Sequence, residues 1–356
     1  MAEICLAYVI LGVTAYAIFG GADFGAGFWD LTAGTARGGG RVRGMIQRSM
    51  APVWEANHVW LIFLFVIVWT AFPVAFGSIF STLSIPLFLA AIGIIFRGAA
   101  FVFRGQAATM REAKVLGAMF ALSSVLIPYF FGAAAGGIAS GRVKVGNAAG
   151  DMIDSWVNPT SALIGVLAVV TGANVAAVYL AGDSERAEQP DLVEAFRRRA
   201  LGSGLLAGLV AIGGLFVVRS DARDLFDGLT SGTGLIMVIV SAVGGAATLA
   251  LVLTRRFNLA RVTSGVAVAA ICVGWVFAQD PYFLPGELTL EQAAASDATL
   301  TALTVVVALG MIILIPSLYY LYRLVLKGQL DQEFEPLDQR FRPLEAGGSP
   351  PPKAGH

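Results

Sequence analysis

The chain has 356 residues, of which 57% are hydrophobic and only 13% are charged. A water-soluble protein usually has about twice that share of charged residues, so the composition indicates an integral membrane protein. The formal net charge is zero, which provides no basic surface for nucleic acid. Two cysteines and two histidines exclude a zinc site, an iron–sulfur cluster and a bis-histidine haem built by this chain alone.

Long apolar segments predict an all-α integral membrane protein, because a helix needs about 20 residues to cross a bilayer. Nine transmembrane helices are expected, near residues 4–30, 52–76, 79–103, 116–140, 157–181, 201–218, 229–254, 262–279 and 298–322. These runs are continuously apolar, unlike the alternating strands of an outer-membrane barrel. We expect residues 1–327 to form a single transmembrane domain. Residues 328–356 are polar and rich in proline, which predicts a flexible cytoplasmic tail.

Lysine and arginine predict the orientation. Of the 24 basic residues, 20 lie in the tail or in the loops after the first, third, fifth and seventh predicted helices, and four lie in the other loops. Cytoplasmic loops carry the excess of basic residues. The N-terminus is therefore predicted outside the cell and the C-terminus in the cytoplasm.

Ionisable residues inside the predicted helices gather in the first three. Asp23 lies within the first helix, Glu55 and His58 open the second, and Arg97 closes the third. In the predicted orientation all four lie in the cytoplasmic half of the membrane. A charge there costs roughly 2.5–3.5 kcal/mol, so the carboxylates are interpreted as groups that relay cytoplasmic protons. The alternative is an Asp–Arg pair that only locks helices together. Asp30 is expected to be an interfacial charge.

Four motifs follow one another in this region. GADFGAGFWDL ends the first helix, APVWEANHVWLI opens the second, TAFPVAFGSIFS follows it, and IIFRGAAFVFR closes the third. In order and spacing over residues 20–104 they resemble subunit II of cytochrome bd-type quinol oxidases. Beyond residue 104, the resemblance has the support of the predicted helix count and orientation alone.

The resemblance implies two four-helix bundles plus one peripheral helix. It also implies a larger subunit I that carries haems b and d and binds quinol. This chain would be the haem-free subunit of an electrogenic enzyme that oxidises quinol and reduces oxygen to water in a bacterial or archaeal plasma membrane. It would hold no metal, catalytic residue or redox centre of its own. A structural quinone in this chain and a small single-helix third subunit stay open.

In the resemblance, the proton-route carboxylates fall on Asp23 and Glu55. The matched structural or interface positions are Trp54, Asn57, His58, Trp60 and Arg97. The chain departs from the family pattern at two places. Val102 stands where the family often has an acid, and His58 stands where glutamine or glutamate is common.

Two other functions stay open on the residues alone. A secondary transporter could be built from nine helices, but carriers usually place charge or broken helices near the bilayer centre, which the fourth to ninth predicted helices lack. A stand-alone redox enzyme would need a homodimer that shares two His58 side chains. Solute uptake by the chain alone would favour the transporter, and a visible haem spectrum of the chain alone would favour the redox enzyme.

Overall fold

The computed structural model describes residues 1–34, 36–50, 54–104, 107 and 109–327, without the side chains of residues 36–38, 55, 110 and 326. The predicted tail, residues 328–356, lies outside this part. The described chain is helical apart from one antiparallel two-stranded hairpin. Its elements are α1 (Ala2–Ala15), the π-helical turn η1 (Tyr16–Gly20), α2 (Gly21–Leu31), α3 (Ala36–Met50), α4 (Trp54–Ala71), α5 (Pro73–Thr82), α6 (Ser84–Arg104), α7 (Met110–Ala139), α8 (Pro159–Arg186), α9 (Pro190–Asp221), α10 (Arg223–Leu229), α11 (Gly232–Leu253), α12 (Phe257–Gln279), β1 (Tyr282–Leu284), β2 (Leu288–Thr289), α13 (Leu290–Ala293) and α14 (Asp297–Leu326).

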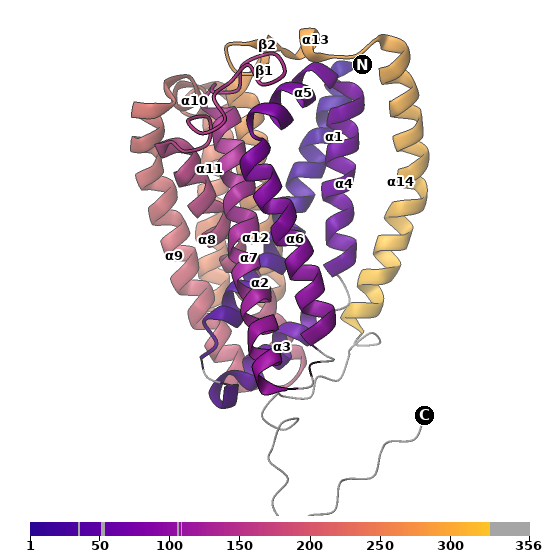
Figure 1. Cartoon of the computed structure of the whole chain (residues 1–356). Coiled ribbons are helices and arrows are strands. Elements are labelled where there is room, and N and C mark those ends of the chain that lie inside the picture. Colours follow the sequence, from indigo (N-terminus) through magenta and orange to yellow (C-terminus); the bar gives the residue numbers. More distant parts are fainter. Residues whose placement is uncertain (35, 51–53, 105–106, 108, 328–356) are drawn as a thin grey trace, which may run out of the picture.

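Eight helices among the described residues are long and apolar enough to cross a membrane. The first is the continuous run Ala2–Leu31, which comprises α1, η1 and α2. Helix α4 is shorter, with an apolar stretch over Ala56–Ala71. The N-terminus and the end of α14 lie at opposite ends of the molecule (Figure 1), as an odd number of crossings requires. The predicted all-helical membrane class is confirmed, while the count of nine stays a prediction.

The second predicted helix, 52–76, is wrong at its C-terminal end. Helix α4 stops at Ala71 and α5 starts at Pro73, because proline has no N–H group with which to continue the hydrogen bonds of a helix. A second break at Leu83 separates α5 from α6, so the third predicted helix begins at Ser84 rather than residue 79. The short helix α5 lies at the same end of the molecule as the N-terminus (Figure 1).

Helix α3 lies at the opposite end, in a segment that we expected to be a loop (Figure 1). Its sequence contains four glycines, each of which disfavours a helix by about 1 kcal/mol relative to alanine. Tertiary packing compensates for this poor propensity. One face of α3 packs against apolar side chains of α8 and α9 through Val42, Met45, Ile46 and Met50.

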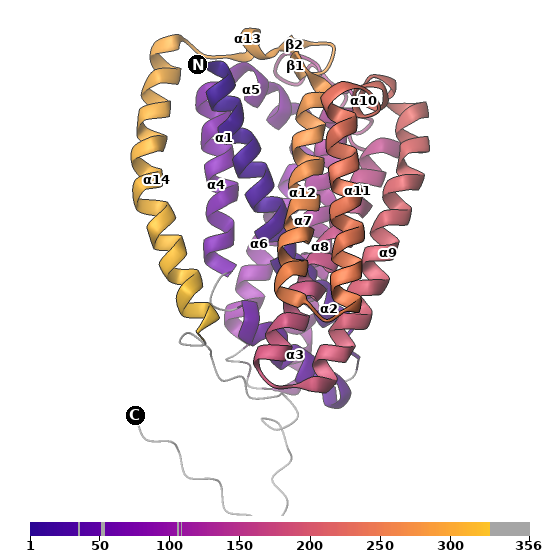
Figure 2. The ribbon, with the colours of Figure 1, turned by 180° about the vertical axis from the view of Figure 1, so that it is seen from behind.

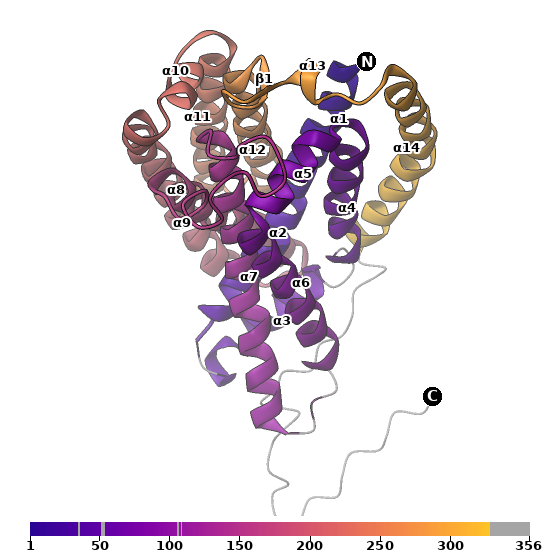
Figure 3. The ribbon, with the colours of Figure 1, turned by 45° about the horizontal axis from the view of Figure 1, so that its top comes forward.

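The helices pack in an order that encloses α2. Helix α2 contacts α7 and α8, α6 contacts α7, and α8, α9, α11 and α12 pack beside one another. Helix α14 lies at the edge, next to α4 and α1 (Figure 2). The hairpin, α10 and α13 cover the end that holds the N-terminus (Figure 3). The division into two four-helix bundles plus one peripheral helix stays a prediction.

Two glycines allow the close packing of α2. A Cβ atom on Gly25 would overlap the carbonyl group of Gly172 on α8, and one on Gly27 would overlap the side chain of Ser124 on α7. Small residues at such contacts let the backbones of membrane helices approach. The sequence stretch around Asp23 therefore determines which helices surround that residue.

We predict that Gly25→Val destabilises the protein by about 3 kcal/mol, because the new side chain overlaps the backbone of α8. Gly213→Val on α9 is the matched control, since a Cβ atom there meets nothing within 4 Å. Thermal unfolding of the purified protein in detergent measures both variants. Equal melting temperatures for the two variants would contradict the packing role of Gly25.

Candidate functional site

A buried ion pair joins α2 to α6. Asp23 is 0% exposed and Arg97 is 3% exposed. An Nη of Arg97 donates hydrogen bonds to Asp23 Oδ1 at 2.8 Å and to the Asp23 carbonyl oxygen at 3.1 Å. The Nε of Arg97 donates to Ser124 Oγ on α7 at 2.9 Å. Three elements thus contribute to one polar site inside the membrane-spanning part of the chain.

Aromatic rings complete the surroundings of Arg97. Its guanidinium carbon lies 5.2 Å from the centre of the Phe24 ring and 4.7 Å from that of Phe120. These contacts stabilise the cation without adding a charge. The second carboxylate oxygen of Asp23, Oδ2, is buried and has no hydrogen-bond partner among the described residues. One oxygen of Asp23 is therefore held by Arg97, and the other is available to a proton or a donor.

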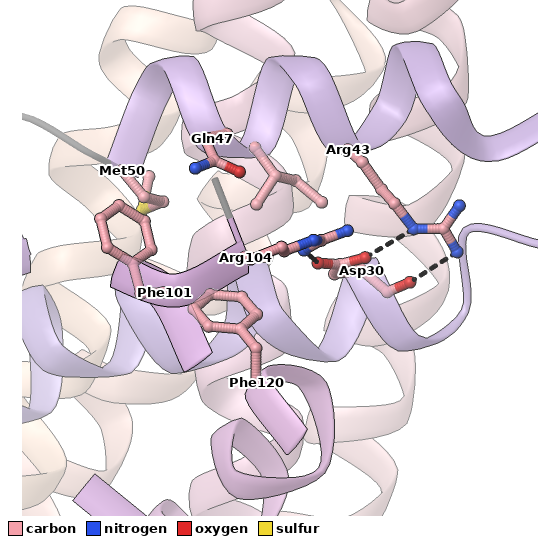
Figure 4. Close-up of a pocket in the computed structure, with 8 residues that line it drawn as sticks. Asp30, Arg43, Gln47, Met50, Phe101, Arg104 and Phe120 are labelled. Carbon is pink, nitrogen blue, oxygen red and sulfur yellow. Dashed lines mark hydrogen bonds and ion pairs between the residues drawn. The ribbon is translucent and has the colours of Figure 1, made fainter. Parts of the chain in front are cut away.

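A second buried ion-pair cluster surrounds Asp30, about two helical turns after Asp23 on α2. Its carboxylate accepts 2.7 Å hydrogen bonds from Arg43 Nε on α3 and from an Nη of Arg104 on α6 (Figure 4). Asp30 is only 4% exposed and Arg104 only 6%. The expectation that Asp30 is an interfacial charge is therefore wrong. Helix α3 covers Asp30, and the guanidinium of Arg43 on α3 binds its carboxylate in place of water.

The two ion pairs repeat along the same helices. Asp30 follows Asp23 by seven residues on α2, and Arg104 follows Arg97 by seven residues on α6. Seven residues bring a side chain back to nearly the same helix face, about 10 Å further along the axis. With Arg43 included, the two aspartates and three arginines carry one net positive charge when all are ionised.

A small cavity lies beside Asp30. Its volume is about 10 Å³, which is near the lower limit for one water molecule. Figure 4 shows its lining residues: Asp30, Arg43, Ile46, Gln47, Met50, Phe101, Arg104 and Phe120. The buried Nε of Arg104 has no hydrogen-bond partner among the described residues. The cavity therefore combines room for a water with a donor that needs an acceptor.

The motif at the start of α4 contributes packing and hydrogen bonds. The centre of the Trp54 ring lies 5.2 Å from the centre of the Phe101 phenyl ring on α6, and the Trp54 carbonyl oxygen is 2.8 Å from His58 Nδ1. Asn57 is 3% exposed and Trp60 is 7% exposed.

Asn57 also ties α4 to the peripheral helix α14. The hydroxyl of Tyr322 on α14 donates to Asn57 Oδ1 at 3.4 Å. The matched positions of this motif therefore hold α4 against both α6 and α14. Glu55 lies in the first turn of α4, but its side chain is outside the described part of the chain, so its predicted role stays a prediction.

Tyr16 was not among the sequence-predicted site residues, although it packs beside them. Its ring lies 6.0 Å from the Phe24 ring, 6.3 Å from the His58 ring and 5.9 Å from the Phe131 ring, all edge-on. Its hydroxyl is buried and has no hydrogen-bond partner among the described residues. Tyr16 also begins the π-helical turn η1.

The described residues contain no group of three or more His, Cys, Asp or Glu side chains that could hold a metal ion. The site described above is thus one of paired charges and hydroxyl groups. Such a site can bind, hold and pass protons, because each carboxylate, hydroxyl and imidazole has a protonated and a deprotonated form.

Comparisons with known proteins agree with the motifs. The family model described as "Cytochrome bd terminal oxidase subunit II" matches residues 1–325. In Bacillus subtilis (strain 168), the chain is 25% identical over 329 residues to "Putative cytochrome bd menaquinol oxidase subunit II", covering 88% of this chain and 92% of that protein. It is also 29% identical over 112 residues, 32% of each chain, to "Cytochrome bd ubiquinol oxidase subunit 2" of the same organism.

A solved structure has the same fold. A chain in "The structure of bd oxidase from Geobacillus thermodenitrificans" superposes on this one with a TM-score of 0.73 at 26% sequence identity. The similarity covers 92% of this chain and 98% of that chain. The agreement thus extends well past residue 104, where the sequence motifs end.

We predict that Asp30→Asn destabilises the protein by about 3 kcal/mol, because it leaves Arg43 and Arg104 together without their shared counter-charge. Asp191→Asn is the control, since Asp191 pairs with Arg41 on the surface, where the side chains are 68% and 60% exposed. That variant should leave the melting temperature unchanged. A melting temperature that falls equally in both variants would show that burial of the Asp30 cluster is not what stabilises α3.

Proposed function

This chain belongs to the cytochrome bd terminal oxidase subunit II family, and we propose that it is the haem-free subunit that leads protons from the cytoplasm toward the haems of subunit I. It is a multi-pass protein of the bacterial plasma membrane and part of an oxidoreductase complex of the respiratory chain. The proposal concerns the finer points: the absence of haem, the pairing and the proton route.

The observation that carries the proposal is the buried Asp23. A carboxylate inside a membrane-spanning helix is expensive, and proton relays are one of the roles that such residues serve. Arg97 holds Oδ1 at 2.8 Å, while Oδ2 has no partner among the described residues. An ion pair that only locks two helices is most stable when both oxygens are bonded. The open Oδ2 therefore favours proton transfer over the purely structural alternative.

The chemistry of oxygen reduction supplies the need for such a route. Reduction of oxygen to water consumes protons as well as electrons, and the oxygen-reducing haem would lie in subunit I. In the predicted orientation Asp23 takes its protons from the cytoplasm, while quinol oxidation releases protons outside. The reaction then moves charge across the membrane without a pump. Glu55 would share this route, as the family motif implies.

We place subunit I against the outer face of α4 and α6, because Asp23 pairs with Arg97 on α6 and Glu55 lies in the first turn of α4. Large apolar side chains are exposed there, including Ile62 (63%) and Trp69 (64%) on α4 and Phe88 (66%) and Ile95 (66%) on α6. Family membership over residues 1–325 argues against the alternative of a secondary transporter.

We predict that Asp23→Asn, in the assembled oxidase, slows the proton-coupled phase of oxygen reduction by about 100-fold, the loss expected for a positioned proton-transfer group. Asparagine is nearly the same size and still accepts a hydrogen bond from Arg97, but it cannot bind a proton. Time-resolved charge transfer across liposomes measures the phase.

The matched control is Asp191→Asn, an exposed carboxylate at the start of α9. The haem spectrum must be intact in both variants. An Asp23→Asn oxidase that takes up protons at the rate of the unmodified enzyme would contradict the proposed route.

We also predict that this chain, purified without subunit I, shows no haem absorbance in the visible range. Co-expression with a haem-bearing subunit I should give a complex that contains both chains and the haem bands. Haem that stays bound to the isolated chain, and is lost on His58→Ala, would show that the chain has a redox centre of its own.

A further inference from the structure

The π-helical turn η1 changes which residues of the first membrane helix face the same neighbours. A π turn has one residue more than an α turn, and such turns are frequent at functional sites. Tyr16, at the start of the turn, packs against Phe24 eight residues later, at 6.0 Å between ring centres. In an uninterrupted α-helix the residue seven positions later would be the better aligned. The turn therefore rotates Tyr16 toward the rings of Phe24 and His58.

Two buried polar atoms without partners lie in this cluster, and their chemistry is complementary. Asp23 Oδ2 can accept a hydrogen bond or carry a proton, and the Tyr16 hydroxyl can donate as well as accept. A buried polar group without a partner costs free energy and calls for an explanation, of which an ordered water is the commonest. Phe24 links their surroundings, because its ring centre lies 6.0 Å from that of Tyr16 and 5.2 Å from the guanidinium carbon of Arg97, the partner of Asp23. A water that bridges the two atoms would satisfy both.

The next acceptor is His58. Its Nδ1 lies 2.8 Å from the Trp54 carbonyl oxygen, which can only accept, so Nδ1 carries the hydrogen and Nε2 the lone pair. Nε2 has no hydrogen-bond partner among the described residues. The centre of the imidazole ring lies 6.3 Å from that of the Tyr16 ring and 6.0 Å from that of the Phe24 ring, with the ring planes steeply inclined in both pairs. His58 is half-buried, so its ring is only partly enclosed by the described part of the chain.

We infer that Tyr16 and His58 form the second half of the proton route, beyond Asp23; this rests on the function proposed above. A proton on Asp23 Oδ2 moves to the bridging water, which passes one of its own protons to the Tyr16 oxygen. Tyr16 gives its original hydroxyl proton to His58 Nε2. Tyr16 and the water end neutral, Asp23 ends as a carboxylate beside Arg97, and His58 becomes an imidazolium that donates the proton toward subunit I.

The test compares Tyr16→Phe with Tyr8→Phe in the assembled oxidase. Both substitutions remove one hydroxyl from the first membrane helix and keep the ring, but Tyr8 packs in a different apolar cluster. Tyr16→Phe should slow the charge-transfer phase by about 100-fold, while haem reduction by quinol in the absence of oxygen stays normal. Tyr8→Phe should match the unmodified enzyme. His58→Phe, which keeps an aromatic ring but has no nitrogen to accept the proton, should also slow the phase.

Asp23→Asn, measured in the same series, separates the two proposals. If it slows the phase and Tyr16→Phe does not, the inference is wrong and the proposed function stands. If Asp23→Asn has no effect, both are wrong. If Tyr16→Phe is slow but His58→Phe is as fast as the unmodified enzyme, the assignment of His58 is overturned. A Tyr8→Phe variant as slow as Tyr16→Phe would overturn the assignment of Tyr16 as well.

Discussion

The structure depends on an ion pair kept away from water, between Asp23 on α2 and Arg97 on α6. Each charge alone would be costly inside the membrane, so neither helix is stable there without the other. The glycines of α2 bring α7 and α8 close to its backbone, and Ser124 of α7 supplies the acceptor for Arg97 Nε. Packing and charge thus act together on α2: α7 and α8 pack against its glycines, and α6 pairs with its aspartate.

The second pair, Asp30 with Arg104, extends this arrangement toward the side predicted to be cytoplasmic. Arg43 on α3 is a second cation bound to Asp30. Helix α3 is therefore held against the other helices by an ion pair as well as by apolar packing. The family often has an acid at the position of Val102, which is 51% exposed here. Asp30 provides a carboxylate on the neighbouring helix instead, bonded to Arg104.

Much of this could be predicted from the sequence, because continuous apolar runs indicate membrane helices without ambiguity. The juxtaposition of Asp23 and Arg97 could be anticipated from their depth, and the pairing of Asp30 with Arg104 from the shared seven-residue spacing. The helical conformation of α3 could not be predicted from the sequence, because its glycines disfavour a helix. It is stabilised by packing against α8 and α9, which the local sequence does not show. The helix break before Pro73 could be predicted from the missing N–H group of proline. The continuous apolar run on both sides of Pro73 instead favoured one uninterrupted helix. Tyr16 was missed because a π turn leaves no sequence signal, and the apolar segment around the tyrosine looks like ordinary helix.

The central claim is that Asp23 gains and loses a proton during turnover, beside a permanently charged Arg97. Infrared difference spectroscopy of the assembled oxidase tests this most directly, since a protonated carboxyl group absorbs separately from a carboxylate. The account predicts a carboxyl band that changes when oxygen is reduced and that is missing in the Asp23→Asn enzyme. A difference spectrum in which this region is identical with and without the Asp23 carboxyl group would contradict it.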